Sequence, residues 1–507
     1  MSFASIHITK RRAFTKGTLL LNTLSEYASM LRTKGAELVR LPAPLDQFVK
    51  PIQQYLTFKR VGVAFLVFYV LFVFLALKIL QREHLQSPVP GTYIRNTYSF
   101  KPRRPLINVS ATTDCHANGA EVRKPYFYRL DDNTYFTNAY FDKRQGGPYI
   151  RILSLRQNNP EHIHTRRLYC LINSALNHSL IAVPADVHIL HDNNDNEYGG
   201  YILTCNARDI LYDNPCKVRI SYERGLSDQL VTIPLVTLNE RYFYATSFAL
   251  CTPPIHGVVT QTQLVEFVEL NRLLGAEHFY FYLYMGNPRQ SYLNPNVEQV
   301  LQHYISAGLV TVFPWQLPIE PERYVWSHAK ALAMQHCLYT NMWKYKYLVF
   351  NDLDEFLIPH STNSWSAMMD SIDKEGASGY CAQSAYFPPD VTQSLRTLHS
   401  FKRTETINTK HTKCIIRPER VFDMGSDGIN KAYDENWPMA VVDQQVALVH
   451  HYKWCTTDWD FHNCFDFVTD ECVGRYEEQL EENFRNTMLV LAGKSVDTKS
   501  MTTYTSP

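Results

Sequence analysis

The stretch from residue 240 to 350 alternates between short apolar runs and amphipathic segments, and this alternation limits the possible fold more than any other feature of the chain. Four runs rich in aromatic and β-branched residues predict strands at 242–251, 278–284, 309–313 and 346–350. Between them, apolar residues at helical spacing predict helices at 260–274, 296–307 and 326–339. Strands that alternate with helices predict a parallel sheet with helices on both faces, and ligands of such sheets bind at the carboxyl ends of the strands.

Acidic residues follow the last of these strands directly. The segment Asp352-Leu353-Asp354-Glu355 comes after the strand at 346–350, and in an extended chain the side chains of Asp352 and Asp354 share a face. Two carboxylates at the ligand end of a sheet favour Mn²⁺ (or Mg²⁺), which can neutralise the charge of a departing diphosphate. Acids after strands also form helix caps or solvated turns. The position after the fourth strand favours a nucleotide-sugar site.

Ordered blocks across residues 240–475 resemble glycosyltransferase family 92. The blocks that carry the resemblance are Cys251-Thr-Pro-Pro254 and residues 264–270, 279–284, 337–339, 350–359, 413–418 and 449–453. The resemblance implies a GT-A fold, a nucleotide-sugar donor and inversion at the anomeric carbon. The activity it implies is galactosyl transfer from a uridine-diphosphate sugar to a fucose-bearing glycan. It also implies a set of site residues: Pro254, Tyr282 and Asp352 for donor binding, and Asp352, Asp354 and His451 as metal ligands.

Two positions depart from the family pattern and keep other functions open. Gln335-His336 stands where the family carries Asn-Asp, and Gly425-Ser-Asp427-Gly stands where a His is usual. An acid at the first position helps to hold the nucleotide. A catalytically decayed glycan-binding or scaffold protein on the same fold is therefore the alternative to a transferase, and a metal-dependent hydrolase is a third possibility.

An inverting transferase also needs a general base to take the proton of the acceptor hydroxyl. The acids after the fourth strand that could fill this role are Asp390, Glu405, Asp427 and Asp443. Spacing does not select among them.

Histidines and cysteines gather near the end of the chain, at His450, His451, Cys455, His462, Cys464 and Cys472. No CxxC or HxxxH pair occurs among them, so we expect disulfides there in preference to a zinc site.

An uncharged apolar run at 61–77 predicts a single membrane-spanning helix. Residues 1–60 contain ten Lys and Arg but three acids, which favours a cytosolic N-terminus and a type II orientation. A buried core helix and a mitochondrial presequence are the alternatives. A net charge of +1 gives no reason to expect a nucleic-acid partner.

All 11 cysteines follow this run, as do sequons at Asn108 and Asn177, which suits a lumenal domain in the Golgi or another secretory membrane. The expected fold class is therefore α/β, a GT-A-type Rossmann-like parallel sheet preceded by a β-rich region and one transmembrane helix. The partners we expect are a nucleotide-sugar donor and a glycan acceptor on a glycoprotein or glycolipid. The expected divisions are a tail (1–60), an anchor (61–80), a stem (81–125), a β-rich region (126–235), the transferase domain (236–480) and a C-terminal tail (481–507).

Overall fold

The computed structural model describes residues 124–144, 146–158, 166–173, 180–193, 196–208, 215–237, 246–284, 286, 294–373, 376–455 and 464–493. These residues belong to one compact unit, Asn108–Pro507. The expected membrane anchor at 61–80 and the sequons at Asn108 and Asn177 lie outside the described residues. Among the helices within the described ranges, none is both long and apolar enough to cross a membrane.

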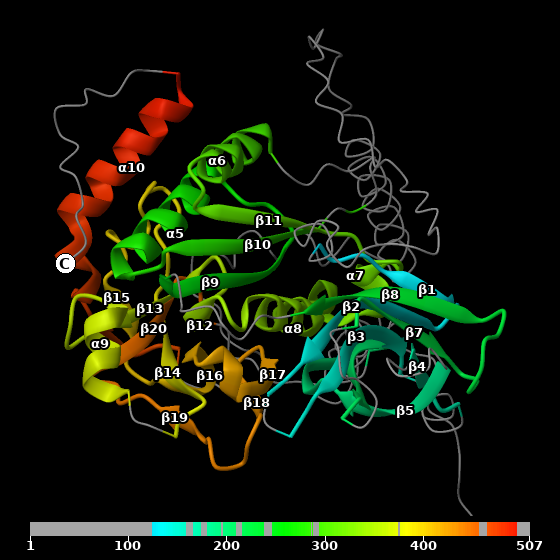
Figure 1. Cartoon of the computed structure of the whole chain (residues 1–507). Coiled ribbons are helices and arrows are strands. Elements are labelled where there is room, and N and C mark those ends of the chain that lie inside the picture. The colour runs from blue at the N-terminus through cyan, green and yellow to red at the C-terminus, as the bar shows by residue number, and fades with distance from the viewer. Residues whose placement is uncertain are drawn as a thin grey trace, which may run out of the picture. The chain divides into compact units, whose positions relative to one another are not determined.

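The strands between residues 128 and 237 form a sheet that closes on itself (Figure 1). Their order is β1-β2-β3-β6-β5-β4-β7-β8, and a further parallel pairing of β2 with β8 closes seven of them into a barrel. Closure pairs the edges that an open sheet would expose. The disulfide Cys170–Cys205 joins β4 to β6 within the barrel core. The strands are β1 (Tyr128–Asp131), β2 (Thr134–Asp142), β3 (Tyr149–Gln157), β4 (Tyr169–Asn173), β5 (Leu180–Ile189), β6 (Tyr198–Asn206), β7 (Lys217–Ser221) and β8 (Leu230–Thr237), with a short 3-10 turn η1 (His191–Asn193) after β5.

A second, mixed sheet follows, in the order β11-β10-β9-β12-β16-β14-β20-β13, with β19 paired to β14. The first four strands of this order are parallel to one another. From β12 onwards the pairings are antiparallel except for β14 with β20 and β14 with β19. The strands are β9 (Thr246–Ile255), β10 (His278–Tyr284), β11 (Val310–Trp315), β12 (Tyr345–Phe350), β13 (Glu355–Pro359), β14 (Gly379–Tyr386), β16 (Asn408–Ile416), β19 (Met439–Val441) and β20 (Ala447–His451).

The remaining strands form two separate two-stranded antiparallel ladders. One pairs β15 (Lys402–Thr404) with β21 (Phe467–Thr469), and the other pairs β17 (Val421–Gly425) with β18 (Gly428–Ala432).

Alternation along the central strands sends side chains to two different cores. On β9, Phe248 and Leu250 join one core, while Ala249 and Cys251 join the other. The first core is covered by α5 (Gln261–Leu274), α6 (Pro295–Ser306), α9 (Trp365–Ile372) and α10 (Glu477–Leu491). Thr260 caps α5 by accepting a bond from the Gln263 N–H, and Gly275 ends it with a φ of 124° that favours glycine.

The second core lies between the sheet and the barrel, where α8 (Lys330–Asn341) is buried along its whole length (Figure 1). Leu332 of α8 packs there with Leu153 of the barrel and Leu348 of the sheet. The Tyr140 and Thr340 hydroxyls lie 2.9 Å apart across this contact. The sheet covers one side of α8 and the barrel the other, so the whole helix is removed from solvent. Shorter turns precede and follow these elements: α7 (Pro321–Tyr324), η2 (Trp326–Ala329), η3 (Pro418–Arg420) and η4 (Cys472–Tyr476).

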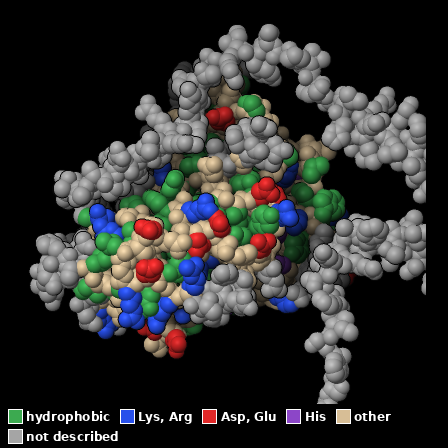
Figure 2. Space-filling model, turned by 90° about the vertical axis from the view of Figure 1, so that its right-hand side faces the viewer, with side chains coloured by type: hydrophobic (Ala, Val, Ile, Leu, Met, Phe, Trp, Pro, Cys, Tyr) green, Lys and Arg blue, Asp and Glu red, His purple; other side chains and the backbone are tan. Residues whose placement is uncertain are grey.

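The fold class expected from the sequence is wrong. Strands and helices occur in the predicted order between 246 and 350, although the helix predicted at 326–339 begins only at Lys330. The sheet they enter is mixed, and a closed seven-stranded barrel makes the described part of the chain β-rich. A Rossmann-like parallel sheet does not describe this arrangement. Alternation of strands and helices stops at β12, so the sequence pattern held no information about the antiparallel strands beyond it. On the barrel side, basic and acidic side chains are interspersed over the visible surface (Figure 2).

Candidate active site

The carboxylates predicted after the fourth strand lie where the two halves of the mixed sheet meet. Residues 351–354 link the end of β12 to β13, although β16, β14 and β20 lie between these strands in the sheet. The Asp352 backbone N–H donates to Glu355 Oε2 at 3.1 Å, and the Glu355 N–H donates to Asp352 O at 3.1 Å. These two bonds fix the link as a turn. We call Asp352, Asp354, Glu355, Lys330 and Lys413 the Asp352 cluster.

Two lysines from different elements hold the Asp352 carboxylate. Lys330, the first residue of α8, places its Nζ 3.1 Å from Oδ1 and 2.8 Å from Oδ2. Lys413 of β16 places its Nζ 3.1 Å from Oδ2. Burial opposes ionisation of Asp352, but the ammonium groups of Lys413 and Lys330 outweigh it and hold the pKa of this carboxyl well below its ordinary value.

Lys413 joins several acceptors inside the cluster. Its side chain is 4% exposed, and its Nζ lies 3.0 Å from Glu355 Oε2 and 3.8 Å from Asp427 Oδ1 and donates to Ser426 O at 2.9 Å. Burial acts to lower the pKa of Lys413, but the carboxylates of Glu355, Asp352 and Asp427 outweigh this effect. The pKa therefore lies above its ordinary value, and the amine stays charged. Burial raises the pKa of Glu355 above its ordinary value in spite of this lysine.

Asp354 and His451 face each other at the more open side of the cluster. Asp354 Oδ2 lies 3.4 Å from His451 Nε2, and Glu355 Oε1 lies 3.4 Å from Nδ1. This Nδ1 atom is buried and has no hydrogen-bond partner among the residues that the structure describes. Burial lowers the pKa of His451, but Glu355 and Asp354 raise it above its ordinary value. Burial acts to raise the pKa of Asp354, but the hydrogen bond and the charge of His451 act in the opposite direction. The pKa of Asp354 therefore lies below its ordinary value.

The donor atoms of this pair fit a divalent cation. A carboxylate oxygen and an imidazole nitrogen converge from Asp354 and His451, and the Asp354 side chain is 34% exposed, which leaves room for ligands from a substrate. Asp352 is different, because both of its oxygens are already engaged by ammonium groups.

A left-handed turn carries Lys330 into the site. Ser327, His328 and Ala329 have φ angles of 45°, 57° and 58°, a conformation that costs about 1–2 kcal/mol for each L-residue. The Trp315 indole N–H donates to His328 O at 2.8 Å, and the His328 ring stacks on His256 with centroids 4.1 Å apart. Strain of this kind gathers at functional sites, and here it directs the residue that binds Asp352.

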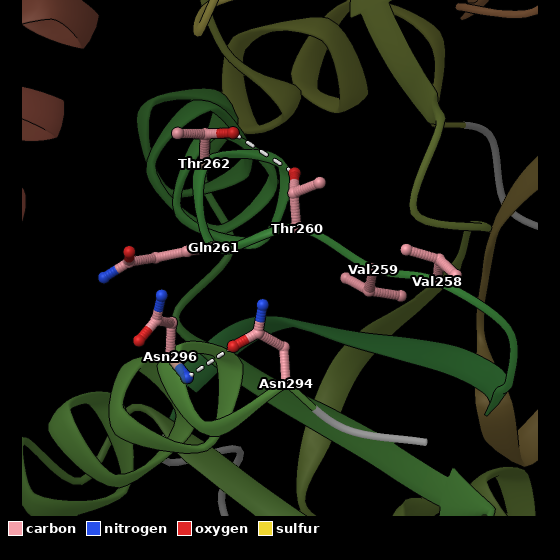
Figure 3. Close-up of a pocket in the computed structure, with 7 residues that line it drawn as sticks. All are labelled: Val258, Val259, Thr260, Gln261, Thr262, Asn294 and Asn296. Atoms are coloured by element: carbon pink, nitrogen blue, oxygen red, sulfur yellow. Dashed lines mark hydrogen bonds between the residues drawn. The ribbon is translucent and has the colours of Figure 1, made fainter. Parts of the chain in front are cut away.

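A hollow beside the loop after β9 lies at the first turns of α5 and α6 (Figure 3). The Thr260 and Asn294 side chains cap these two helices. The described residues that line the hollow offer amides and hydroxyls, whereas the Asp352 cluster consists of ionisable groups. The residues lining the hollow are Val258, Val259, Thr260, Gln261, Thr262, Asn294 and Asn296.

Comparison with known proteins agrees with these features. Residues 246–488 match the sequence model of glycosyltransferase family 92. The beta-1,4-galactosyltransferase galt-1 of Caenorhabditis elegans is 25% identical over 375 residues, which cover 71% of this chain and 81% of that protein. Residues 246–488 form a glycosyltransferase family 92 domain. The family resemblance predicted from the ordered blocks is confirmed, and the chain is a glycosyltransferase.

Solved structures that match this family 92 transferase do so only loosely. HddC from Yersinia pseudotuberculosis has 8% sequence identity and a TM-score of 0.21, over 46% of this chain and 99% of that chain. The 4-diphosphocytidyl-2C-methyl-D-erythritol synthase from Anaerococcus prevotii has 9% identity and a TM-score of 0.20, over 46% of this chain and 96% of that chain.

In the family 92 domain, the candidate bases lie in different places. Asp427, on the turn between β17 and β18, reaches the cluster through Lys413 and lies 3.2 Å from His411 Nδ1. The Asp390 carboxylate accepts bonds from the Thr392 N–H and hydroxyl within its own exposed loop. Glu405 and Asp443 are exposed, and Asp443 accepts a local bond from the Gln445 N–H.

The expected donor-binding residues Pro254 and Tyr282 pair across β9 and β10, and both are buried. The Tyr282 hydroxyl lies 2.6 Å from His336 Nδ1, so this tyrosine contacts α8. Gln335 is fully buried and donates to Asp423 Oδ1 at 3.0 Å and Met424 O at 2.7 Å. The departure at Gln335-His336 therefore has a packing explanation in this family 92 member.

Sequence reasoning missed the two lysines that hold the Asp352 carboxylate. Lys413 lies in one of the blocks that carry the resemblance, at 413–418, and this was a usable signal. Nothing around Lys330 in the sequence indicates its role, because the left-handed turn before it contains no glycine.

Proposed function

We propose that this family 92 transferase moves galactose from a uridine-diphosphate sugar to a glycan acceptor, with inversion and with the help of Mn²⁺ or Mg²⁺. The observation that carries the proposal is the meeting of Asp354 and His451 with two lysines around Asp352. A nucleotide-sugar reaction needs positive charge next to a leaving diphosphate, and this cluster offers both lysines and ligands for a cation. The relative galt-1 is named as a beta-1,4-galactosyltransferase, which makes galactose the first donor sugar to test.

Asp354 and His451 would hold the cation through the carboxylate oxygen and imidazole nitrogen that face each other. When bound, such a cation supplies positive charge to the diphosphate. Lys330 and Lys413 add fixed positive charge of their own, already oriented by Asp352. Groups that are oriented before the reaction stabilise developing charge more effectively than water does.

Asp427 is the base we propose for the acceptor hydroxyl. Its side chain is 40% exposed, so an acceptor can approach it, and it lies 3.8 Å from the cluster lysine Lys413. The acceptor oxygen bonds to the anomeric carbon while its proton passes to Asp427. The bond from that carbon to the phosphate oxygen breaks, and its electron pair leaves with the diphosphate. Attack opposite to the leaving group gives inversion.

We also propose that the domain works in the lumen of the secretory pathway. Four disulfides occur among the described residues, at Cys170–Cys205, Cys251–Cys337, Cys381–Cys414 and Cys455–Cys464. Such bonds persist in oxidising compartments and are rare in the cytosol. This setting also supplies glycoprotein and glycolipid acceptors.

A donor screen with the purified full chain tests the proposal. We expect transfer from UDP-galactose to a fucose-bearing glycan in the presence of Mn²⁺, little free sugar without acceptor, and loss of transfer with EDTA. Asp354→Asn should reduce transfer about 100-fold or more, while Asp370→Asn on the exposed face of α9 should not. Unchanged transfer by a combined Asp352→Asn and Asp354→Asn variant would show that the site is misplaced. Release of free galactose at the rate of transfer would favour a hydrolase.

A further inference from the structure

A second group of metal-binding side chains lies on the opposite side of β20 from the Asp352 cluster. His450 precedes His451 on this strand, so the two side chains point to opposite faces. His450 meets His360, which follows β13, Asp470, which follows β21, and Cys472, which begins η4. The ligand atoms of His360, Asp470 and Cys472 all lie within 4.8 Å of one another. We call these four residues the His450 cluster.

Asp470 faces both imidazoles of the cluster without forming a hydrogen bond to either. The Asp470 Oδ2 atom lies 3.7 Å from His360 Nε2 and 3.9 Å from His450 Nε2, beyond hydrogen-bond range. The two Nε2 atoms lie 3.3 Å apart, at the distance of a long hydrogen bond between the imidazoles. Donor atoms on one tetrahedral zinc ion, at about 2.0–2.3 Å from the metal, lie roughly 3.3–3.8 Å apart. The distances among the two imidazoles and Asp470 are close to this range, and Cys472 Sγ lies within 4.8 Å of the ligand atoms of His360 and Asp470.

We propose that His360, His450, Asp470 and Cys472 bind one structural zinc ion. Two imidazole nitrogens, one thiolate and one carboxylate make a tetrahedral set that zinc prefers and that Mn²⁺ and Mg²⁺ do not. The site differs in this respect from the Asp352 cluster, whose ligands are mainly oxygen atoms.

The surroundings of the cluster suit a buried ion. His450 is fully buried, and the side chains of Asp470 and His360 are 5% and 14% exposed, so an ion could enter past His360 and the half-buried Cys472. Arg403 Nε donates to Asp470 Oδ2 at 3.0 Å, and this oxygen retains a lone pair for zinc. Hydrogen bonds from outside commonly orient a metal-binding carboxylate in this way.

The charges balance once the thiol has lost its proton. Burial and the nearby Asp470 carboxylate raise the pKa of Cys472 to about 11, so the thiol is protonated without an ion. Zinc binding would release that proton to solvent. The thiolate and the carboxylate then match the two charges of zinc, and Arg403 and Arg475 remain as the neighbouring cations.

An ion here would connect four segments that are far apart in sequence. It would join the end of β13, strand β20, the segment after β21 and the turn η4 that leads into α10. Because His451 follows His450 on β20, the ion would also hold the strand that presents His451 to Asp354.

Metal content and cobalt spectroscopy on the purified full chain test this proposal. An Asp354→Asn background removes the contribution of the other site. We expect close to one zinc per chain, and Co²⁺ substitution should give intense tetrahedral visible bands and a thiolate-to-cobalt band in the near ultraviolet. Cys472→Ser should remove the thiolate band, and His360→Gln should lower zinc content at least tenfold. His399→Gln, an exposed histidine of the same domain, is the matched control and should change neither.

A measurement on the unmutated chain covers the case in which a variant fails to fold. Cys472 should resist maleimide in the zinc-loaded protein and react after chelation. Absence of zinc together with a freely reactive thiol, or a cobalt spectrum unaffected by Cys472→Ser, would overturn the proposal and leave a histidine pair beside an Arg403–Asp470 ion pair.

Discussion

The two halves of the mixed sheet differ in how they are built and in what they bring to the active site. Strands β11, β10, β9 and β12 are parallel, alternate with helices and end at the same edge. Strands β16, β14, β20 and β13 pair largely antiparallel and follow one another without such helices, α9 excepted. The parallel half brings the carboxylate of Asp352, whereas the other half brings Lys413 and His451.

The difference shows that the site depends on the junction of the two halves. Asp352 binds one lysine from each side of the junction between β12 and β16, Lys330 from α8 and Lys413 from β16. A parallel sheet alone would place carboxylates at its edge without the cations that balance them. Changes at contacts across the junction should therefore have larger effects than changes within either half.

Replacement of Lys413 by Met should have the largest effect on stability. It would leave the Glu355 and Asp352 carboxylates without their shared ammonium group, and Glu355 is almost fully buried. Breaking a buried ion pair from one side costs about 3–5 kcal/mol. The free energy of unfolding from denaturant titration measures the loss. Lys402→Met, at an exposed position on β15, should change it by less than about 0.5 kcal/mol. A loss of the same small size for Lys413→Met would mean that the junction does not depend on this charge.

Replacement of Asp427 by Asn should lower kcat about 100-fold, the lower end for removal of a general base, with little change in donor KM. Burial raises the pKa of Asp427, but the His411 hydrogen bond and Lys413 lower it below its ordinary value, so the base is ionised at neutral pH. His411→Ala should therefore raise this pKa and move the acidic limb of the kcat/KM profile to higher pH. A profile that stays in place, or full activity in Asp427→Asn, would assign the base elsewhere.

The contrast between the halves also explains how much of the fold the sequence reveals. The strands and helices from β9 to β12 follow from periodicity, because α5 and α6 carry apolar residues at helical spacing between short apolar strands. Beyond β12 the order β16-β14-β20-β13 rests on pairings between distant residues, such as Glu355 with His451, and periodicity does not specify those. Barrel closure by β2 and β8 is a pairing of the same kind.

The residues of the candidate site also divide into those that the sequence reveals and those that it does not. Asp352 and Asp354 are recognisable because they follow a strand directly, and family resemblance points to His451. Lys330 could not be found from the sequence, since its position depends on three left-handed residues that are not glycine. The choice among the acids depended on how the β17–β18 turn packs, which has no local signal.

Gln335→Glu tests whether the junction also depends on a neutral side chain. Gln335 of α8 donates to Asp423 and Met424 of β17 and accepts from the Met424 N–H at 3.2 Å. A glutamate of the same shape cannot donate these bonds and would face the buried Asp423 carboxylate. We expect a loss of about 2 kcal/mol in the free energy of unfolding, since each buried acceptor left without a donor costs about 1–3 kcal/mol. Gln302→Glu, on the exposed side of α6, is the control. If Gln335→Glu instead tightens donor binding without loss of stability, this position belongs to the nucleotide site, as the family pattern implies.

The smallest effect should come from Asp373, which joins the halves away from the site. Its carboxylate accepts bonds from the hydroxyls of Tyr347 on β12 and Tyr380 on β14, and it pairs with Arg417. Burial raises the pKa of Asp373, but the two tyrosines and Arg417 lower it below its ordinary value.

A group with a lowered pKa in the folded state contributes stability above its unfolded pKa of about 3.9 and loses it as pH falls through the folded value. Asp373→Asn should therefore cost about 1 kcal/mol at pH 7, a value at the low end for charged hydrogen bonds because the group lies near the surface. The difference from the unmutated chain should stay constant from pH 7 to about pH 5 and shrink below about pH 4. Asp370→Asn, one turn earlier on α9 and exposed, should show no such dependence in parallel urea titrations. A difference that grows as the pH falls would mean that the ionised carboxylate destabilises this contact and that the two halves are held together without it.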